Sequence, residues 1–540
     1  MKKVLIIDIK RKYDIKKLSD IFKSIQFEQV LSLTPFSSYV LDCYGIKYQT
    51  FHDIKSIVSF RELVLNKYNH IKFTIGEYHE CSYLLRNLMQ IVTHEEYIGV
   101  INSHIESMKN REITYLTDTS KDFSMNELRQ NKYSLLHLNK NIANTIILNE
   151  TSKFFHFNSN FFKKIKSLKK KGLIKKILNK ILNIKVGYEN VYLSNFIKRY
   201  KVDSMQFKKI DTVAMLKDCR QKCIDCIGSD IDYIYESLFD DLERVLENFK
   251  PKEILNFFTY IADSESWIKY LLLRKNKKTI VFTQHGSYLY EHFFYKYCEA
   301  LPECINLVSN DYTKQKFLKL KSNNVYTIGS ENLNYRIYDS SNEFDFLYIT
   351  YNVNYSGYGV YIESDSCMHS MDGNNIFKKH QEIINLFGTK FKDKKICIKV
   401  QPGIFAGTML YVPFLELSKE YKNITIEVST PISSLIQKSK YIISDYFSSE
   451  FINRELHYKR DIILFKGAPL PLPEDTLEDM EKMFILVETV DDLKAKVENI
   501  EEITKDRPRY DDIIEYYSSK KCDTKKAVAE ILEKELNARA

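Results

Sequence analysis

Gln284, His285 and Gly286 directly follow a run of mostly β-branched residues at 279–283. Such a run predicts a buried parallel strand, and the polar residues after it would lie at its carboxyl end, where open α/β sheets bind ligands. An imidazole there can hold a phosphate or transfer a proton, and glycine permits a sharp turn close to a ligand. A buried histidine bonded to loop carbonyl groups is the alternative. The pattern alone leaves both interpretations open.

A second polar segment, within residues 440–451, follows an apolar strand that ends at Ser444 and Asp445. Asp445 ends this strand, and a helix is predicted to begin at about Ser448. The start of a helix presents free N–H groups and the positive end of its dipole, which favour phosphate. Hydroxyl groups of Ser448 and Ser449 would add donors, and Glu450 could accept a hydrogen bond from a ribose. Simple capping of the helix is the alternative, but the segment favours nucleotide binding.

Two further loops should reach the same edge of the sheet. One contains Ser356 and Gly357, in a polar stretch able to surround a diphosphate. The other follows the strand that carries Lys399, a possible point charge for phosphate, and continues with Gln401. For each loop by itself, a solvated surface loop is the favoured interpretation, and the evidence for a site comes from several polar strand ends together.

The elements that would position these residues alternate between strands and helices. A βαβαβ pattern occupies residues 253–330, a polar link follows at 339–345, and a second alternating series begins near residue 343. Strands of the second series are expected at residues 346–351, 395–400, 424–428, 441–446 and 461–465. This pattern predicts an α/β protein with two Rossmann-type halves and an N-terminal elaboration.

The predicted domains follow from this division. Residues 1–338 form an N-terminal α/β domain, 343–507 a C-terminal nucleotide-binding domain, and 508–540 helices able to pack on either half. The chain has 540 residues and a net charge of +9, and no apolar stretch is long enough to span a membrane. Its first residues resemble a strand more than a signal peptide.

Residues 161–185 contain ten lysines and no acidic residue, with apolar residues at helical spacing. A basic amphipathic helix of this kind suits an anionic membrane surface. A solvated helix packed on its own domain is an equal alternative. Nucleic acid is disfavoured, because no aromatic stacking platform accompanies the charge.

Three cysteines, Cys219, Cys223 and Cys226, have a spacing that some iron–sulfur proteins use. They share one helical face with apolar residues, so we interpret them as small buried side chains. Asp230 and Asp232 have the spacing of a metal-binding DxD motif but lie in a stretch with helical periodicity. We therefore predict neither a metal nor a cofactor.

The order of QHG after one strand, Gln401-Pro402 after another, and SDYxSSxF before a helix resembles a known family. It is similar to GT-B glycosyltransferases of bacterial surface polysaccharides, such as Kdo-type transferases of capsule and lipopolysaccharide. More distantly it resembles CDP-glycerol glycerophosphotransferases of teichoic acid synthesis. The resemblance covers roughly residues 250–500. The family often has His-Pro where this chain has Gln401-Pro402, which removes a cationic contact.

The resemblance implies a GT-B-like fold whose two halves face each other, with donor mainly on the C-terminal half and acceptor on the N-terminal half. The candidate general bases are His285, then Asp263 and Glu265. The implied donor-binding residues are Gln284, Gly286, Ser356, Gly357, Lys399, Gln401, Asp445, Ser448, Ser449 and Glu450.

The sequence thus predicts a metal-independent, inverting glycosyltransferase. It would move a sugar from a nucleotide donor to a surface glycan or lipid-linked acceptor at the inner face of the cytoplasmic membrane. A CDP-polyol phosphotransferase and a non-catalytic nucleotide-sugar-binding assembly protein are the alternatives.

Replacing His285 distinguishes the two interpretations of the first motif. If His285 is a catalytic acid or base, His285→Ala should reduce turnover by about 10²-fold or more while nucleotide affinity is retained. Steady-state kinetics and nucleotide titration measure the two effects. Loss of thermal stability alone would show that the histidine is a structural residue.

Overall fold

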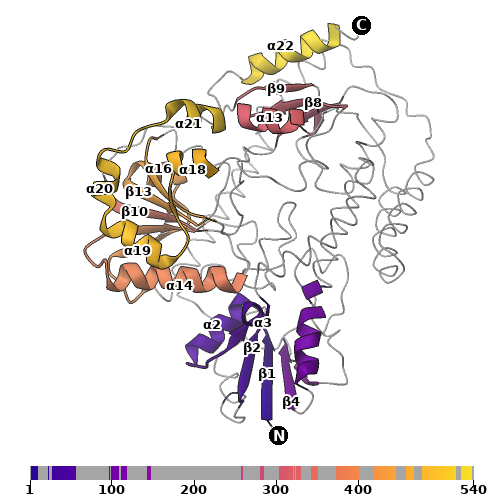
Figure 1. The fold of residues 1–540 in the computed structure, drawn as a ribbon, viewed down its shortest axis with the longest axis vertical. Helices are drawn as coiled ribbons and strands as arrows, with labels where there is room; N and C mark the ends of the chain where they lie inside the picture. The colour runs from indigo at the N-terminus through magenta and orange to yellow at the C-terminus, as the bar shows by residue number, and fades with distance from the viewer. Residues whose placement is uncertain are drawn as a thin grey trace, which may run out of the picture.

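The computed structural model describes three parallel sheets and the helices around them (Figure 1). The described residues are 2–9, 22, 27–55, 96–97, 99–108, 111–117, 143–147, 257–258, 270, 280–284, 303–319, 322, 324–329, 342–350, 373–400, 418–445, 458–466, 477–518 and 524–537. The basic segment 161–185, the three clustered cysteines and the DxD pair lie outside them. Within these residues no helix is long and apolar enough to cross a membrane.

The largest sheet has six strands, all parallel. Its strands are β10 (Phe344–Ile349), β11 (Ile396–Lys399), β12 (Ile424–Glu427), β13 (Ser439–Ser444), β14 (Asp461–Phe465) and β15 (Ile485–Val487). Their order is β12-β11-β10-β13-β14-β15. Numbered from β10, this is the 3-2-1-4-5-6 order of a dinucleotide-binding Rossmann sheet. The direction of winding reverses between β10 and β13.

Helices cover both faces of this sheet, because successive residues of a strand point to opposite sides. The helices are α14 (Gly373–Thr389), α16 (Ile432–Gln437), α18 (Leu477–Met483), α19 (Val490–Glu498), α20 (Ile500–Lys505) and α21 (Asp511–Tyr517). Residues of α14 and α19 pack on one face, and residues of α16, α18 and α21 pack on the other. The predicted α/β class with Rossmann-type sheets is therefore confirmed.

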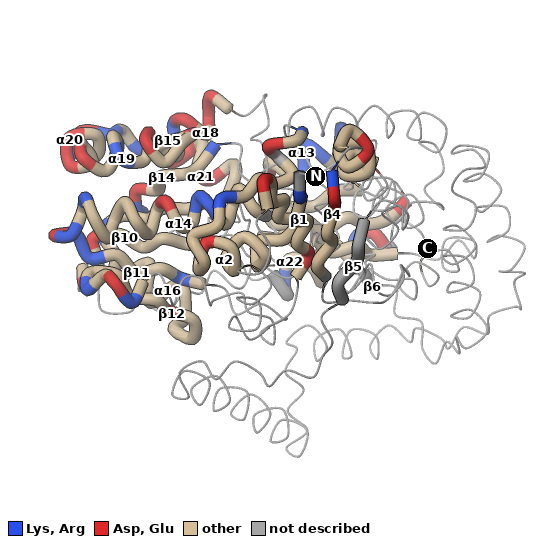
Figure 2. The backbone as a smooth tube through the Cα atoms, turned by 90° about the horizontal axis from the view of Figure 1, so that it is seen from below, with Lys and Arg blue, Asp and Glu red and all other residues tan. Residues whose placement is uncertain are grey.

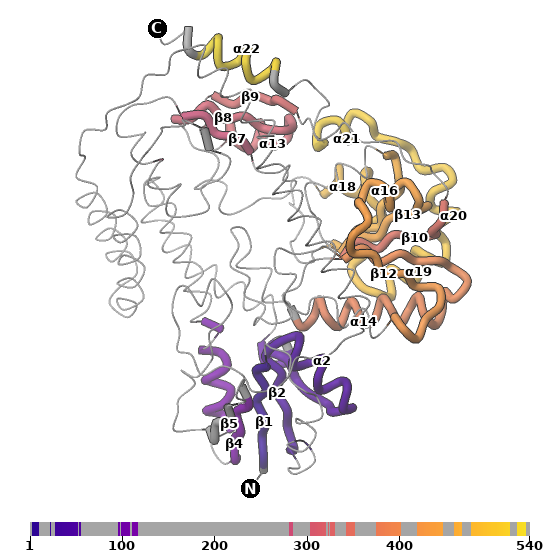
Figure 3. Tube along the Cα trace, turned by 180° about the vertical axis from the view of Figure 1, so that it is seen from behind, coloured from indigo at the N-terminus to yellow at the C-terminus, as the bar shows by residue number. Residues whose placement is uncertain are grey.

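A five-stranded parallel sheet stands at the N-terminus, in the order β3-β2-β1-β4-β5. Its strands are β1 (Lys2–Asp8), β2 (Gln29–Ser32), β3 (Gln49–Thr50), β4 (Arg111–Thr117) and β5 (Ala143–Ile147), with α2 (Pro35–Cys43) and α3 (Phe51–Ile54) beside them. Figures 1 and 3 both show α2 beside α14. Ser38 Oγ donates to Asn374 Oδ1 at 2.8 Å, which links the two helices. One apolar cluster includes residues of both sheets.

The third sheet has four parallel strands in sequence order. They are β6 (Phe257–Phe258), β7 (Val281–Thr283), β8 (Ile305–Val308) and β9 (Val325–Thr327), with α13 (Asp311–Lys319) after β8. The C-terminal helix α22 (Thr524–Asn537) contributes Leu532 to the core of this sheet. Asn310 donates to the Tyr517 carbonyl of α21 at 2.9 Å, while Tyr517 packs on the six-stranded sheet. The C-terminal helices thus pack on both the four-stranded and the six-stranded sheet.

The change from the four-stranded to the six-stranded sheet falls between residues 327 and 344, where the sequence has its polar link. The five strands expected in the second series are all present. β2, β3, β4 and β15 were not predicted, nor were helices α2, α3 and α18–α20. β15 has three residues and directly follows a helix, so no separate periodicity marks it. The domain limits themselves stay a prediction.

Acidic residues are present on each of α18, α19 and α20 (Figure 2). Each of these helices has an acidic pair in its first turn. Carboxylates there compensate the positive end of the helix dipole. In α19, Thr489 and Asp492 also form a capping box. Much of the negative charge of this region is therefore explained by helix stability.

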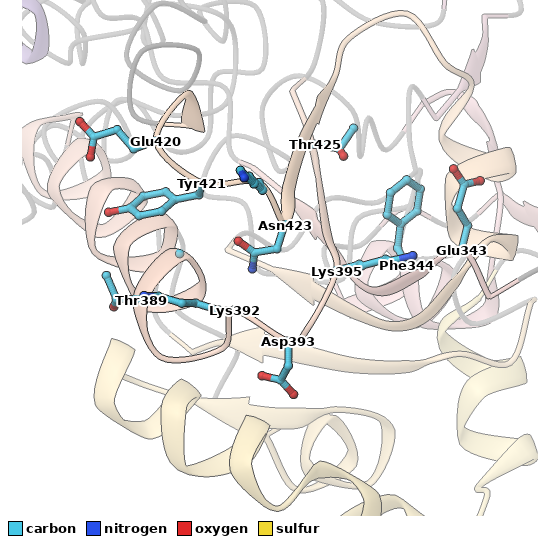
Figure 4. A pocket seen from close by; sticks show the side chains of 12 residues that line it. Glu343, Phe344, Thr389, Lys392, Asp393, Lys395, Glu420, Tyr421, Asn423 and Thr425 are labelled. Atoms are coloured by element: carbon cyan, nitrogen blue, oxygen red, sulfur yellow. The ribbon is translucent and has the colours of Figure 1, made fainter.

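A hollow of about 840 Å³ lies at the amino-terminal edge of the six-stranded sheet, opposite the edge where ligands are expected (Figure 4). Tyr421 lies at one side of it, and its hydroxyl donates to Asn385 Oδ1 at 2.9 Å. The ring of Tyr421 lies over Gly388 of α14, where an added Cβ would come within 2.3 Å of the ring. Glycine at this position therefore makes room for the aromatic ring.

Replacing this glycine should destabilise the protein. Gly388→Ala adds helix propensity of about 1 kcal/mol, but displacing the Tyr421 ring should cost about 1–3 kcal/mol. We expect a net loss of about 1 kcal/mol in the free energy of unfolding, measured by chemical denaturation. Gly99→Ala is the matched control, because Gly99 is helical and has no atom within 4 Å of the added Cβ. Equal stability of the two variants would contradict this account.

Candidate functional site

The carboxyl ends of β10 and β13 form the point where the winding of the six-stranded sheet reverses. Ligands of open α/β sheets bind in the crevice outside such a point, since adjacent loops there turn to opposite faces. Thr350 follows β10, Asp445 follows β13, and both side chains are buried. We call this place the switch-point edge.

Asp445 receives hydrogen bonds from two different elements at the switch-point edge. Tyr348 of β10 donates its hydroxyl to Asp445 Oδ2 at 2.8 Å, and His380 Nε2 of α14 lies 2.6 Å from the same oxygen. Tyr348 and Asp445 are 0% exposed and His380 is 2% exposed. Three elements are thus joined at one carboxylate.

The local sequence explains why these side chains meet. Residues 441, 443 and 445 share one face of the β13 segment by the period of two, and that face is covered by α14. In α14, Ile376, Phe377, Ile383 and Ile384 form the buried stripe, and His380 lies in its middle by helical spacing. A polar side chain in such a stripe needs a buried partner.

Charge and burial act against each other in this cluster. Burial alone would raise the pKa of Asp445, but the charge of Lys379 and the hydrogen bonds from His380 and Tyr348 bring that pKa below its usual value. Burial lowers the pKa of His380, and the Asp445 carboxylate opposes this only in part. An ionised Asp445 and a neutral His380 follow, so His380 donates its Nε2–H.

Lys399 lies at the end of β11, on the same edge, and is 5% exposed. Its ammonium donates to the carbonyl oxygens of Val428 and Thr430 at 2.7 and 2.9 Å. Burial lowers the pKa of Lys399, and the charge of Glu427 opposes the shift. In this structure the lysine holds the turn after β12, and its predicted contact with phosphate stays a prediction.

Gln284 lies at the end of β7, in the four-stranded sheet. Its side-chain oxygen accepts from the Ser309 N–H at 2.9 Å and from the Ser309 hydroxyl at 3.1 Å. Its amide nitrogen donates to Thr313 Oγ1 at 3.3 Å. These contacts fix the end of β7 to the start of α13.

Among the predicted site residues, the structure thus places Lys399 and Asp445 on one edge and Gln284 on another sheet. The others lie outside the described residues: His285, Asp263, Glu265, Gly286, Ser356, Gly357, Gln401, Ser448, Ser449 and Glu450. Sequence reasoning missed Tyr348, Lys379 and His380. The signal for His380 was its place among the apolar residues of a predicted helix. Nothing in the sequence identified Asp445 as its partner.

The N-terminal sheet repeats this arrangement. Asp8 ends β1, is 0% exposed, and accepts from the Tyr115 hydroxyl of β4 at 2.5 Å. β1 and β4 are the neighbouring strands at which this sheet reverses its winding. The five-stranded and six-stranded sheets therefore each have a tyrosine–aspartate pair at the reversal point.

Among the described residues, no group of three or more His, Cys, Asp or Glu is arranged to hold a metal ion. No protein-family model and no curated protein sequence matches the chain. Solved structures resemble it weakly.

The S. aureus MnaA–UDP co-structure is 12% identical, with a TM-score of 0.36, over 57% of this chain and 83% of that one. The Methanocaldococcus jannaschii UDP-GlcNAc 2-epimerase in complex with UDP-GlcNAc and UDP is 16% identical, with a TM-score of 0.35, over 57% and 82%. The calicheamicin glycosyltransferase CalG4 is 9% identical, with a TM-score of 0.34, over 81% and 93%. Likenesses of this degree assign neither a family nor an activity to the chain.

The buried cluster should make stability depend on pH. The folded protein holds His380 at a pKa below the ordinary 6.5, so the unfolded chain binds more protons below that pH. The free energy of unfolding should therefore fall as pH decreases below about 6.5 and fall further as the depressed pKa of Asp445 is passed. Denaturant unfolding at a series of pH values measures it. His380→Gln should flatten the first decline and cost about 2 kcal/mol at pH 7, because a hydrogen bond to the buried carboxylate is lost.

Tyr348→Phe is the matched control for this experiment. It removes one hydrogen bond to the same carboxylate oxygen and should cost about 2 kcal/mol. It leaves the histidine in place, so the decline below pH 6.5 should persist. If wild type and His380→Gln show the same pH dependence, His380 does not titrate as described.

Proposed function

We propose that this protein is a glycosyltransferase that binds a nucleotide-activated sugar at the switch-point edge of the six-stranded sheet. The observation that carries the proposal is the all-parallel β12-β11-β10-β13-β14-β15 order, with buried polar residues at the reversal between β10 and β13. Sheets of this order bind nucleotides outside that point. The SDYxSSxF motif begins there, since Asp445 is its aspartate.

The chemistry proposed is displacement at the anomeric carbon of the donor sugar. An acceptor hydroxyl attacks this carbon, the bond from the carbon to the phosphate oxygen breaks, and a base takes the hydroxyl proton. The leaving nucleotide gains negative charge, which groups at the switch-point edge would stabilise. His285 stays the first candidate for the base, with Asp263 and Glu265 after it.

A GT-B-like arrangement of facing Rossmann-type halves is part of the proposal. It is supported by contacts between the six-stranded sheet and the other sheets, through α14 and α2 on one side and through α21 and α13 on the other. A surface glycan or lipid-linked acceptor and a place at the inner membrane face stay predictions from the sequence. The basic segment 161–185 on which the membrane prediction depends lies outside the described residues.

A panel of activated donors tests the function. Purified protein is incubated with UDP-, GDP- and CMP-sugars and with CDP-glycerol, and release of the free nucleotide is measured. We expect one class of nucleotide sugar to bind and to be hydrolysed slowly or transferred, while the other classes are not turned over. The matching nucleosides serve as controls for binding without phosphate.

The other outcomes decide between the alternatives. Turnover of CDP-glycerol alone would show a polyol phosphotransferase. Binding of a nucleotide sugar without turnover, with acceptor glycans present, would indicate a binding or assembly protein. Failure to bind any member of the panel would contradict the proposal.

A further inference from the structure

Lys379 lies at the switch-point edge, although no sequence motif marks it. It precedes His380 on α14, and its ammonium lies 4.7 Å from the centroid of the Phe465 ring. Phe465 is the last residue of β14, the strand beside β13. The charge of Lys379 also acts on Asp445, after β13. The ring contact therefore places this cation at the carboxyl end of β14, and its charge is felt at Asp445 after the neighbouring strand.

Three other lysines near this edge also contact groups of the protein itself. The ammonium of Lys399 donates to main-chain carbonyl oxygens after β12. Lys466 pairs with Glu488 at 3.3 Å. The ammonium of Lys378 lies 5.5 Å from the centroid of the Tyr48 ring, in the N-terminal part of the chain. The charge of Lys379 acts on Asp445 and lowers the pKa of that carboxyl.

We propose that Lys379 binds the phosphate groups of the nucleotide donor. This inference rests on the proposed function and names the residue that supplies positive charge at that site. The remaining residues of the SDYxSSxF motif, which the sequence predicts to hold phosphate, follow Asp445 directly in the chain. Lys379 would supply a cationic contact to a site where this chain has Gln401 and the resembling family often has histidine.

The surroundings of Lys379 suit such a role. The side chain is partly exposed. Its apolar stem can lie on the Phe465 ring while the ammonium reaches solvent or a ligand. A lysine acts on phosphate as a compact point charge that needs no fixed orientation. The same charge would stabilise the nucleotide as it leaves, when its negative charge increases.

Nucleotide titration of charge variants tests the proposal. Calorimetry is performed with the nucleoside diphosphate or monophosphate that wild type binds best, and with the corresponding nucleoside. Lys379→Gln should weaken binding of the nucleotide by about 10-fold or more, because one phosphate contact is lost, and leave nucleoside binding unchanged. Lys379→Arg should restore most of the nucleotide affinity. Lys378→Gln, the adjacent change of charge on α14, should bind as wild type.

Several results would overturn the proposal. Unchanged nucleotide affinity in Lys379→Gln, or an equal loss for nucleotide and nucleoside, would show that Lys379 serves only the Asp445 cluster. Lys379→Met keeps the stem on Phe465, so it provides a second neutral variant if the glutamine variant does not fold. If wild type binds no nucleotide at all, the proposed function itself is wrong, and this outcome is distinct from a failure of Lys379 alone.

Discussion

The carboxylate of Asp445 is buried without solvent contact, and the arrangement of the six-stranded sheet around the proposed site depends on how its charge is satisfied. An unpaired buried charge would cost several kcal/mol. Tyr348, His380 and Lys379 meet this requirement from β10 and α14. β10 and α14 belong to the first half of the Rossmann unit, whereas Asp445 follows β13 in the second half. The cluster can therefore form only when the two halves are in register. Its satisfied hydrogen bonds therefore select one arrangement of strands and helix.

A second constraint acts where α14 meets the N-terminal sheet. Buried hydroxyl groups near the start of α2 form hydrogen bonds with one another and with their surroundings. The Thr34 hydroxyl donates to the Ile9 carbonyl at 2.7 Å. The hydroxyl oxygens of Ser32 and Ser38 lie 2.8 Å apart, and Ser38 also donates to Asn374 of α14. Apolar residues of both units surround them in one cluster. The apolar area supplies most of the attraction, and the directional hydrogen bonds fix the orientation. α14 thus serves the proposed donor site and the N-terminal unit together.

The C-terminal helices α21 and α22 connect the four-stranded sheet to the rest of the described chain. α22 fills one side of that sheet with Leu532, while α21 contacts both α13 and the six-stranded sheet. Segments about two hundred residues apart in sequence are therefore packed together. If donor and acceptor meet between the four-stranded and six-stranded sheets, the C-terminal helices set the distance between these two sheets. The contact between α13 and α21 joins residues on either side of the six-stranded sheet in the sequence, so it depends on the complete chain between them.

Local patterns in the sequence determined the α/β class, the five expected strands of the second series and Asp445 as a polar residue after a buried strand. These features depend on neighbours in sequence, since apolar runs and helical spacing record which face of an element is buried. The short β15 escaped prediction because three residues carry no period. Only the tertiary structure showed that Asp445 accepts hydrogen bonds from Tyr348 and His380. It also showed that Lys399 and Gln284 form hydrogen bonds with nearby loops, and that Lys379 lies at the switch-point edge. Such pairs come from strands and helices brought together by sheet order, and a single sequence records no contact between residues so far apart.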